Sequence, residues 1–235
     1  LNVSNTITGR VVNEDFIDAF PQLFSYNQVQ NLNLLSAIID ISAEFKTKGI
    51  KITPELLAAV IITLENLVGG YDFLPYEEYG DYCAGPSCTY KINGQCRKEE
   101  YEGGCDYKGR GFIQITHKSN YEKYGGSTFV SDRKDECECV GKPYCSNSEC
   151  APAKALEKEF VSKIFVSYFI DKGLIELSNN NEFSEVGFRI NGEKNYAENF
   201  EKKALEKLKS IKSSPEKLNE FMINLVDSNT INSNQ

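Results

Sequence analysis

The sequence lacks three features that would each point to a particular class of protein. It contains no run of about 18 apolar residues, so we expect no segment that spans a membrane. No linker rich in proline and serine interrupts its 235 residues, which favours a single domain over residues 1–235. Basic residues are outnumbered, with 26 Lys and Arg against 34 Asp and Glu. The net charge of -8 argues against nucleic acid or an anionic membrane as a partner, whereas a neutral polysaccharide suits it.

Histidine is nearly absent, since His117 is the one imidazole in the chain, but cysteine is frequent. The eight cysteines form two groups: Cys83, Cys88, Cys96 and Cys105, then Cys137, Cys139, Cys145 and Cys150. A zinc site is the competing interpretation, but neither group has the close Cys-x-x-Cys or Cys/His spacing that it needs. An even count in segments rich in Gly, Asn and Ser predicts disulfides within each group, in an oxidising compartment. We therefore expect a secreted or extracellular protein, a cell-wall or spore-wall location included.

The second cysteine group predicts a Cys-rich insertion over residues 127–152. A structural loop is the favoured interpretation, because Tyr144 is its one clear aromatic residue. The alternative is that this insertion grips a substrate. Residues 227–235, rich in Asn and Ser, are predicted to form a flexible tail.

The remaining segments are predicted to be scaffold. Apolar residues recur at helical spacing over residues 28–45, 153–177 and 195–212, and Pro215 is expected to open a last helix. Strand signal is confined to short pieces such as residues 112–116. The sum predicts an α+β fold that is mainly α-helical.

The segment Thr53-Pro54-Glu55 has the features of a helix start: an N-cap candidate, a proline at the first helical position and an acid in the first turn. The residues up to Leu64 are nearly all apolar, so we expect a buried helix. Glu65 ends this run. Partial desolvation is expected to raise its pKa, so that it could keep a proton near neutral pH and give it to a leaving group. The alternative is that Glu65 merely surfaces where the helix ends.

Residues 71–80 combine carboxylates with four aromatic side chains. Such a segment suits sugar rings, which stack on aromatic faces through their C–H groups while their hydroxyls form hydrogen bonds. If Glu65 is an acid held on a helix and Glu77 lies across a cleft, the pair has the two-carboxylate arrangement of a glycosidase. Glu78 stays open as the alternative second carboxylate. The plain alternative is a solvent-exposed acidic loop.

Residues 109–116, Gly-Arg-Gly-Phe-Ile-Gln-Ile-Thr, predict a turn on two glycines that passes into a strand with alternating polar and apolar side chains. Gln114, Thr116 and Asn120 are therefore candidate hydrogen-bonding groups along a groove. An ordinary solvated strand on a packed sheet is the alternative.

In their order, these segments resemble the family 19 chitinases, glycoside hydrolases whose fold is an α-rich relative of the lysozymes. The family's acid-bearing helix, Phe-Leu-Ala-x-x-x-His-Glu-Thr/Ser-Gly-Gly, is similar to residues 57–70, with the glycines displaced. Its block Tyr-Gly-Arg-Gly-Pro/Leu-Ile-Gln-Leu-Ser/Thr is similar to residues 107–116, with one inserted residue. Its Ile-Asn-Gly-Gly motif is similar to residues 190–193, where Glu193 replaces the second glycine. The matched blocks lie within residues 13–212.

The resemblance implies a bilobal lysozyme-like fold with a small β-hairpin region and a central substrate cleft. It implies an endo-acting chitinase that hydrolyses β-1,4 bonds between N-acetylglucosamine units with inversion and with no metal or cofactor. A monomer is the expectation for a secreted glycosidase of this size. The implied catalytic roles are a general acid for Glu65, a general base for Glu77 and a water-holding hydroxyl for Thr116. The residues implied to bind chitin or chitooligosaccharides are Gln114, Asn120, Asn191 and Tyr121.

The chain departs from the family pattern near both carboxylates. Leu64 replaces the family's histidine, and inserted residues before Gly69 bear on the position of Glu77. Two other functions therefore stay open. One is a peptidoglycan-degrading hydrolase of lysozyme type, whose Ala-Asn-Tyr-Glu pattern is approached by residues 119–122 but whose anionic substrate suits the net charge poorly. The other is a catalytically inactive chitin-binding protein.

Overall fold

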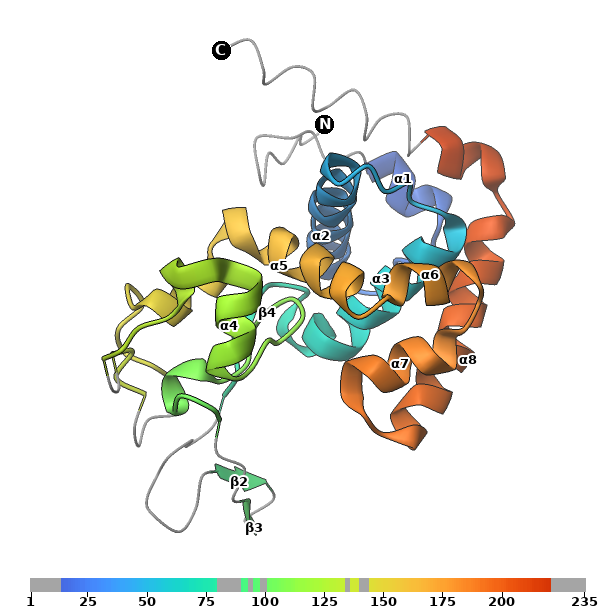
Figure 1. Ribbon diagram of the computed structural model, residues 1–235. Coiled ribbons are helices and arrows are strands. Elements are labelled where there is room, and N and C mark those ends of the chain that lie inside the picture. Colours follow the sequence, from blue (N-terminus) through green and yellow to red (C-terminus); the bar gives the residue numbers. More distant parts are fainter. Residues whose placement is uncertain are drawn as a thin grey trace, which may run out of the picture. The chain divides into compact units, whose positions relative to one another are not determined.

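The computed structural model describes residues 14–79, 90–92, 95–97, 101–133, 136–139 and 144–220, with the backbone alone at 14–15, 90–92 and 95–97. The predicted tail at 227–235 lies outside this part of the chain. The protein is mostly helical, with short antiparallel strand pairs, which confirms the α+β, mainly α-helical class (Figure 1). The described residues within 1–74 and 169–235 form one compact unit, called the first unit, and those within 75–168 form the second unit.

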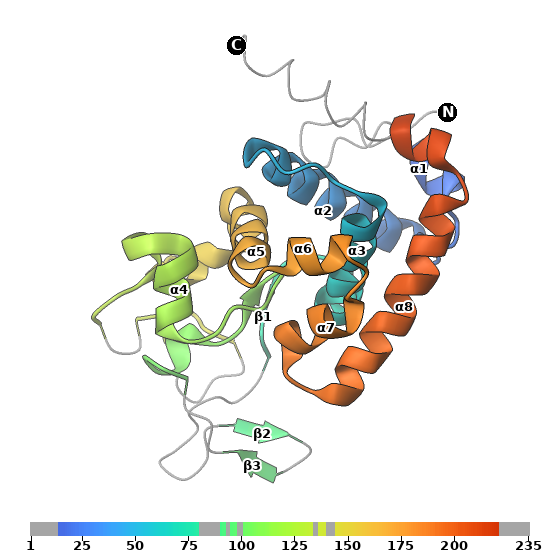
Figure 2. The ribbon, with the colours of Figure 1, turned by 45° about the vertical axis from the view of Figure 1, so that its right-hand side comes forward.

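The first unit is built from helices. They are α1 (Glu14–Ala19), α2 (Gln28–Thr47), α3 (Pro54–Val68), the 3-10 turn η1 (Gly69–Tyr71), α6 (Leu174–Asn179), α7 (Phe183–Asn191) and α8 (Lys194–Lys212). Residues 215–220 are helical as well. Figure 2 shows α3 at the centre of this unit, where it packs against α2, α6 and α8, while α7 packs on α8. The helices predicted over residues 28–45 and 195–212 are confirmed.

Helix α3 begins as the sequence predicts. The Thr53 side chain accepts a hydrogen bond from the Leu56 N–H at 3.0 Å, and Pro54 occupies the first helical position. Every residue from Leu56 to Leu64 is buried, because all sides of the helix are apolar and covered by neighbours. Glu65 follows directly, on the last turns of the helix.

The helix predicted over residues 153–177 is divided into three. A 3-10 helix, η4 (Ala151–Leu156), precedes α5 (Lys158–Asp171), and α6 follows after a break. Gly173 produces this break, because it adopts the left-handed conformation with φ 64°, which interrupts a right-handed helix. The residues at the boundary of the two units, Tyr168 and Phe169, both belong to α5.

The second unit carries the strands. Strand β1 (Tyr76–Glu77) pairs antiparallel with β4 (Arg110–Gly111), and β2 (Tyr90–Ile92) pairs with β3 (Gln95–Arg97). Its helices in the described ranges are η2 (Cys105–Tyr107), α4 (Lys118–Gly125), η3 (Gly126–Phe129), η4 and the part of α5 up to Tyr168.

The prediction of a strand over residues 112–116 is wrong. Residues 112–114 form a turn, which an isolated bridge between Arg110 and Ile115 closes. Phe112, Ile113 and Ile115 are all buried, so the polar and apolar residues do not divide between two faces of a strand. Gln114 adopts φ 52°, which a regular strand does not contain.

Disulfides confirm the predicted pairing in the second cysteine group, with Cys137 bonded to Cys150 and Cys139 to Cys145. Cys105 of the first group is also disulfide-bonded, and the other three side chains of that group lie outside the described part. Such bonds persist in oxidising compartments. Within the described ranges, no helix is both long and apolar enough to cross a membrane.

Candidate functional site

Two cations of the Gly-Arg-Gly segment hold the carboxylate of Glu77. The register of β1 and β4 places Glu77 opposite Arg110, whose Nε and terminal nitrogen each lie 2.9 Å from Oε2 of Glu77. The Nζ atom of Lys108 lies 3.0 Å from Oε1. Both cationic side chains are fully buried and the Glu77 side chain is 12% exposed, so this is a buried ion cluster.

A backbone group completes the environment of Glu77. The N–H of Cys145 donates to Oε1 at 2.7 Å. Each oxygen of Glu77 therefore has two protein donors, which is close to the full hydrogen-bonding capacity of a carboxylate. Burial alone would raise the pKa of Glu77, but Arg110, the Cys145 N–H and Lys108 outweigh it and hold the pKa below its ordinary value.

Tyr121 of α4 forms hydrogen bonds with both cationic residues, Lys108 and Arg110. Its hydroxyl donates to the carbonyl of Lys108 at 2.6 Å and accepts from Arg110 at 3.1 Å. Arg110 also donates to the carbonyl of Asp106. Tyr121 has no exposed surface, and burial raises its pKa to about 12. The structure therefore places Tyr121 beneath the Lys108–Arg110 segment, as a support of the ion cluster.

Glu78 has a different environment from its neighbour. Its Oε2 accepts from the Tyr101 hydroxyl at 2.7 Å and from the Gly109 N–H at 3.1 Å. Among the described residues, Oε1 of Glu78 has no hydrogen-bond partner. Gly109 permits this approach, because a Cβ atom there would lie 3.1 Å from Oε2 of Glu78 and 2.8 Å from Oε1 of Gln114.

The structure brings Gln114, Thr116 and Asn120 into the same unit, on the turn after β4 and the start of α4. Gln114 donates both amide protons to backbone carbonyls, of Gly111 at 2.7 Å and Tyr76 at 3.0 Å. Asn120 donates to the carbonyl of Thr116 at 2.8 Å. All three side chains are partly exposed. Their oxygen atoms are thus the groups that remain for a ligand.

His117 holds a loop. Its Nδ1 accepts from the backbone N–H of Glu102 at 3.1 Å, so the neutral ring carries its proton on Nε2. Its ring lies edge-on to Tyr101, with the centroids 5.5 Å apart. His117 is therefore linked to Glu78 through Tyr101.

Glu65 lies in the first unit, where α3 meets α8. Its side chain is 9% exposed, and its Oε1 lies 2.6 Å from Nζ of Lys207, which is 14% exposed. Burial, and next the charge of Glu65, raise the pKa of the neighbouring Tyr26 hydroxyl. Lys203, one turn before Lys207, donates to the side chain of Asn66 at 3.1 Å. The expected shielding of Glu65 from water is present, and a cation accompanies it.

Asn191 is the last residue of α7 and is exposed. The following Gly192 ends the helix in the left-handed conformation, with φ 82° and its N–H donating to the carbonyl of Phe188 at 2.7 Å. The Asn-Gly pair therefore presents the Asn191 amide at the end of α7, in the same unit as Glu65.

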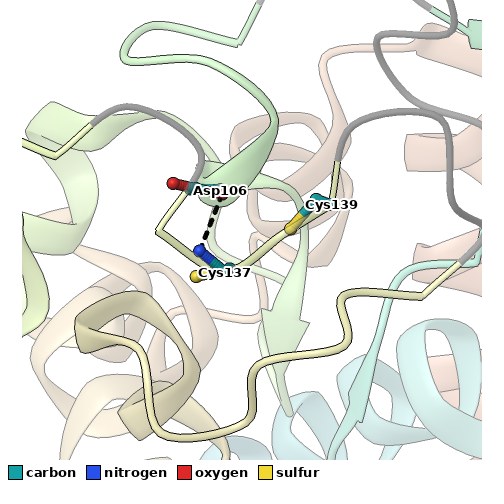
Figure 3. A group of neighbouring side chains, drawn as sticks. All are labelled: Asp106, Cys137 and Cys139. Carbon is teal, nitrogen blue, oxygen red and sulfur yellow. Dashed lines mark hydrogen bonds between the residues drawn. The ribbon is translucent and has the colours of Figure 1, made fainter.

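Asp106, Cys137 and Cys139 lie close enough together to suggest a metal site (Figure 3). Both cysteines are in disulfides, however, so neither offers a thiolate ligand. Asp106 instead accepts from the backbone N–H of Glu136 at 2.7 Å and of Cys137 at 3.2 Å. The arrangement anchors the Cys-rich segment to η2.

The sequence matches no family model, and a search of curated proteins finds no match.

The candidate residues divide between the units. The first unit contains Glu65 and Asn191, and the second contains Glu77, Glu78, Gln114, Thr116, Asn120 and Tyr121.

Sequence reasoning gave no role to Lys108, Arg110 or Lys207. A role for Lys108 and Arg110 could have been predicted, because two cationic residues that flank Gly109 on a buried segment need an anionic partner. Lys207 gave no such signal, since it belongs to a helix face with many other charges.

Proposed function

We propose that the chain is a chitin-oligosaccharide hydrolase of lysozyme-like fold that acts by inversion, with Glu65 as general acid and Glu78 as general base. The observation that carries the proposal is the unequal state of the two neighbouring glutamates. Glu77 has donors on both oxygens, whereas Glu78 keeps Oε1 without a hydrogen-bond partner within the described residues. A general base needs a lone pair that can accept a proton from water.

Glu77 is better suited to hold the site than to act as the base. Binding a water molecule would require it to give up Lys108, Arg110 or the Cys145 N–H. Its lowered pKa also makes it a weaker proton acceptor. Through β1, Glu77 instead fixes the backbone from which Glu78 projects. We therefore assign the role of general base to Glu78 rather than to Glu77, the residue that the spacing in the family 19 chitinases favours.

In this reaction, Glu65 first takes up a proton in place of its ion pair with Lys207. It then donates this proton to the glycosidic oxygen as the C1–O bond breaks. Glu78 removes a proton from the water that attacks C1 from the opposite face, and the product forms as the α-anomer. Positioned acid and base groups each contribute about 10²- to 10⁴-fold in rate.

Substrate positioning falls to the side-chain oxygens of Gln114 and Asn120 and to Thr116 in the second unit, and to Asn191 in the first. Because the Gln114 and Asn120 amide groups already donate to backbone carbonyls, their oxygens are oriented. Such fixed acceptors suit the N–H of an acetamido group. Tyr121, which is fully buried, would act by supporting Lys108 and Arg110. Disulfide stapling fits secretion, where an extracellular chitin is accessible.

The test is NMR of the anomeric protons during digestion of chitin hexasaccharide. We expect early α-anomer from the unmutated protein, and at least a hundredfold loss of rate in Glu65→Gln and in Glu78→Gln. Full activity in Glu78→Gln, with loss in a folded Glu77→Gln variant, would return the role of base to Glu77. Hexasaccharide binding without any cleavage would identify a chitin-binding protein, and release of fragments from peptidoglycan alone would identify a lysozyme.

A further inference from the structure

Two exposed tyrosine rings lie beside the ion cluster of the second unit. Tyr79 is 59% exposed and Tyr144 is 52% exposed, and their centroids are 5.1 Å apart at an interplanar angle of 63°. One ring follows β1 and the other belongs to the Cys-rich segment, 65 positions later by the difference of 144 and 79. The fold therefore brings together two aromatic residues that the sequence separates.

The Tyr144 ring lies beside the ion cluster, and the Tyr79 ring packs against it. Tyr79 directly follows Glu78, and Tyr144 directly precedes Cys145, whose N–H binds Glu77 and whose sulfur is bonded to Cys139. The Nζ atom of Lys108 lies 5.9 Å from the centroid of Tyr144, within the range of a cation–π contact. Tyr144 is thus held by a disulfide-bonded neighbour and a buried cation, while half of its surface remains open.

We propose that Tyr79 and Tyr144 form an aromatic platform that binds a pyranose ring of the saccharide chain, as a subsite contributed in part by the Cys-rich segment. An aromatic face presents apolar surface with partial negative charge, which matches the C–H face of a sugar. The neighbouring Oε1 of Glu78 and the side-chain oxygen of Gln114 supply acceptors for its hydroxyl and amide groups. The proposal rests on the proposed function for the identity of the sugar.

A protein partner fits this surface less well. In the described part of the second unit, Tyr79 and Tyr144 are the only large apolar side chains that are strongly exposed. A stable protein interface buries at least about 1,000 Å² around an apolar centre, which two rings do not provide. One or two sugar rings are the size of ligand that this pair covers.

The test uses isothermal titration of chitin hexasaccharide into a Glu65→Gln background, where the ligand is not cleaved. Tyr79→Ala and Tyr144→Ala should each weaken binding about three- to tenfold, the range expected for loss of one stacking contact. Tyr144→Phe keeps the ring and should bind as the background does. Leu205→Ala, which removes an apolar side chain of α8 of similar exposure, is the matched control.

A second measurement avoids any instability of the Glu65→Gln background. In the otherwise unmutated protein, Tyr144→Ala should raise KM for the hexasaccharide about three- to tenfold. Alanine variants that bind and cleave the hexasaccharide as the parent does would overturn the proposed tyrosine platform but leave the proposed hydrolase function intact. Tyrosine-dependent binding without cleavage would support the platform while the hydrolase fails, and a background that binds no hexasaccharide would overturn the platform.

Discussion

Oε1 of Glu77 accepts a hydrogen bond from the backbone N–H of Cys145 at 2.7 Å, across 68 positions of the chain. Cys145 is bonded to Cys139, and its sulfur lies 3.1 Å from a terminal nitrogen of Arg110, the same side chain that holds the other oxygen of Glu77. The disulfide thus fixes one residue that contacts both members of the ion pair. The Cys-rich segment is therefore part of the candidate site and not only a disulfide-bonded loop remote from it.

The two disulfides of this segment should therefore have separable effects. Removing Cys139–Cys145 by a double serine substitution should lower kcat for chitin hexasaccharide at least tenfold, because the N–H ligand of Glu77 becomes mobile. The Cys137–Cys150 bond joins residues 13 rather than 6 positions apart and so closes a longer loop. Removing it should therefore cost more stability, within the usual range of about 2 to 5 kcal/mol. Urea unfolding and hydrolysis rates measure the two effects. If the two variants lost the same activity when the same fraction of each was folded, the prediction of separate effects would be wrong.

The ion cluster predicts acid sensitivity. The pKa of Glu77 is lower in the folded protein than its ordinary value of 4.5, so its pairing stabilises the fold fully above that pH. The contribution is lost as the pH falls through the lower, folded-state pKa. Glu77→Gln should cost about 3 to 5 kcal/mol at neutral pH, because Lys108 and Arg110 stay buried without their anion.

The difference in unfolding free energy between the wild type and Glu77→Gln should consequently shrink as the pH drops below about 4.5. Urea titrations at a series of pH values measure it. A difference that stays constant from neutral pH to strong acid would show that Glu77 is not the ion that stabilises this cluster.

Two lysines of α8 provide a matched comparison. Lys207 pairs with Glu65 and Lys212 pairs with Glu55, in both cases at 2.6 Å and between the same two helices. Lys207 is 14% exposed and Lys212 is 51% exposed. Lys207→Met should destabilise the protein by about 3 to 5 kcal/mol, because Glu65 is left buried without a cation. Lys212→Met should cost less than about 1 kcal/mol.

Thermal and urea unfolding of both lysine variants decide this point. Lys207→Arg keeps the charge and should recover most of the stability. Equal costs for the two methionine variants would mean that burial does not strengthen the Glu65 pair.

The local rules of helix formation were sufficient for α3, because cap, proline and apolar run all act within a few residues. They were insufficient at residues 112–116, where alternation of apolar and polar residues is also produced by a tight turn whose apolar side chains are all buried. The difference lies in Gln114, whose amide protons bind two carbonyls and stabilise a positive φ. That contact involves Tyr76, far away in sequence.

The candidate site shows the same limit. Glu65 and the Glu77–Glu78 pair were identified because carboxylates beside apolar or aromatic runs are visible in a sequence. Their partners Lys207, Lys108 and Cys145 were not, because each partnership requires a register or a helix packing that only the fold supplies. Sequence spacing alone therefore left the choice between Glu77 and Glu78 open.

Gly109 offers the sharpest test of Glu78 and Gln114. A Cβ atom at this position would lie 2.8 Å from Oε1 of Gln114, 3.1 Å from Oε2 of Glu78 and 3.3 Å from Cβ of Glu78. The two closest of these atoms are at the far ends of side chains that can shift. Gly109→Ala should therefore fold but displace both groups, lowering kcat for chitin hexasaccharide at least tenfold with little change in unfolding temperature. Gly70→Ala is the matched control, because its added Cβ would meet no atom within 4 Å and its backbone is not left-handed. A Gly109→Ala variant with full activity would exclude Glu78 and Gln114 from the reaction, since neither could occupy its present position beside that methyl group.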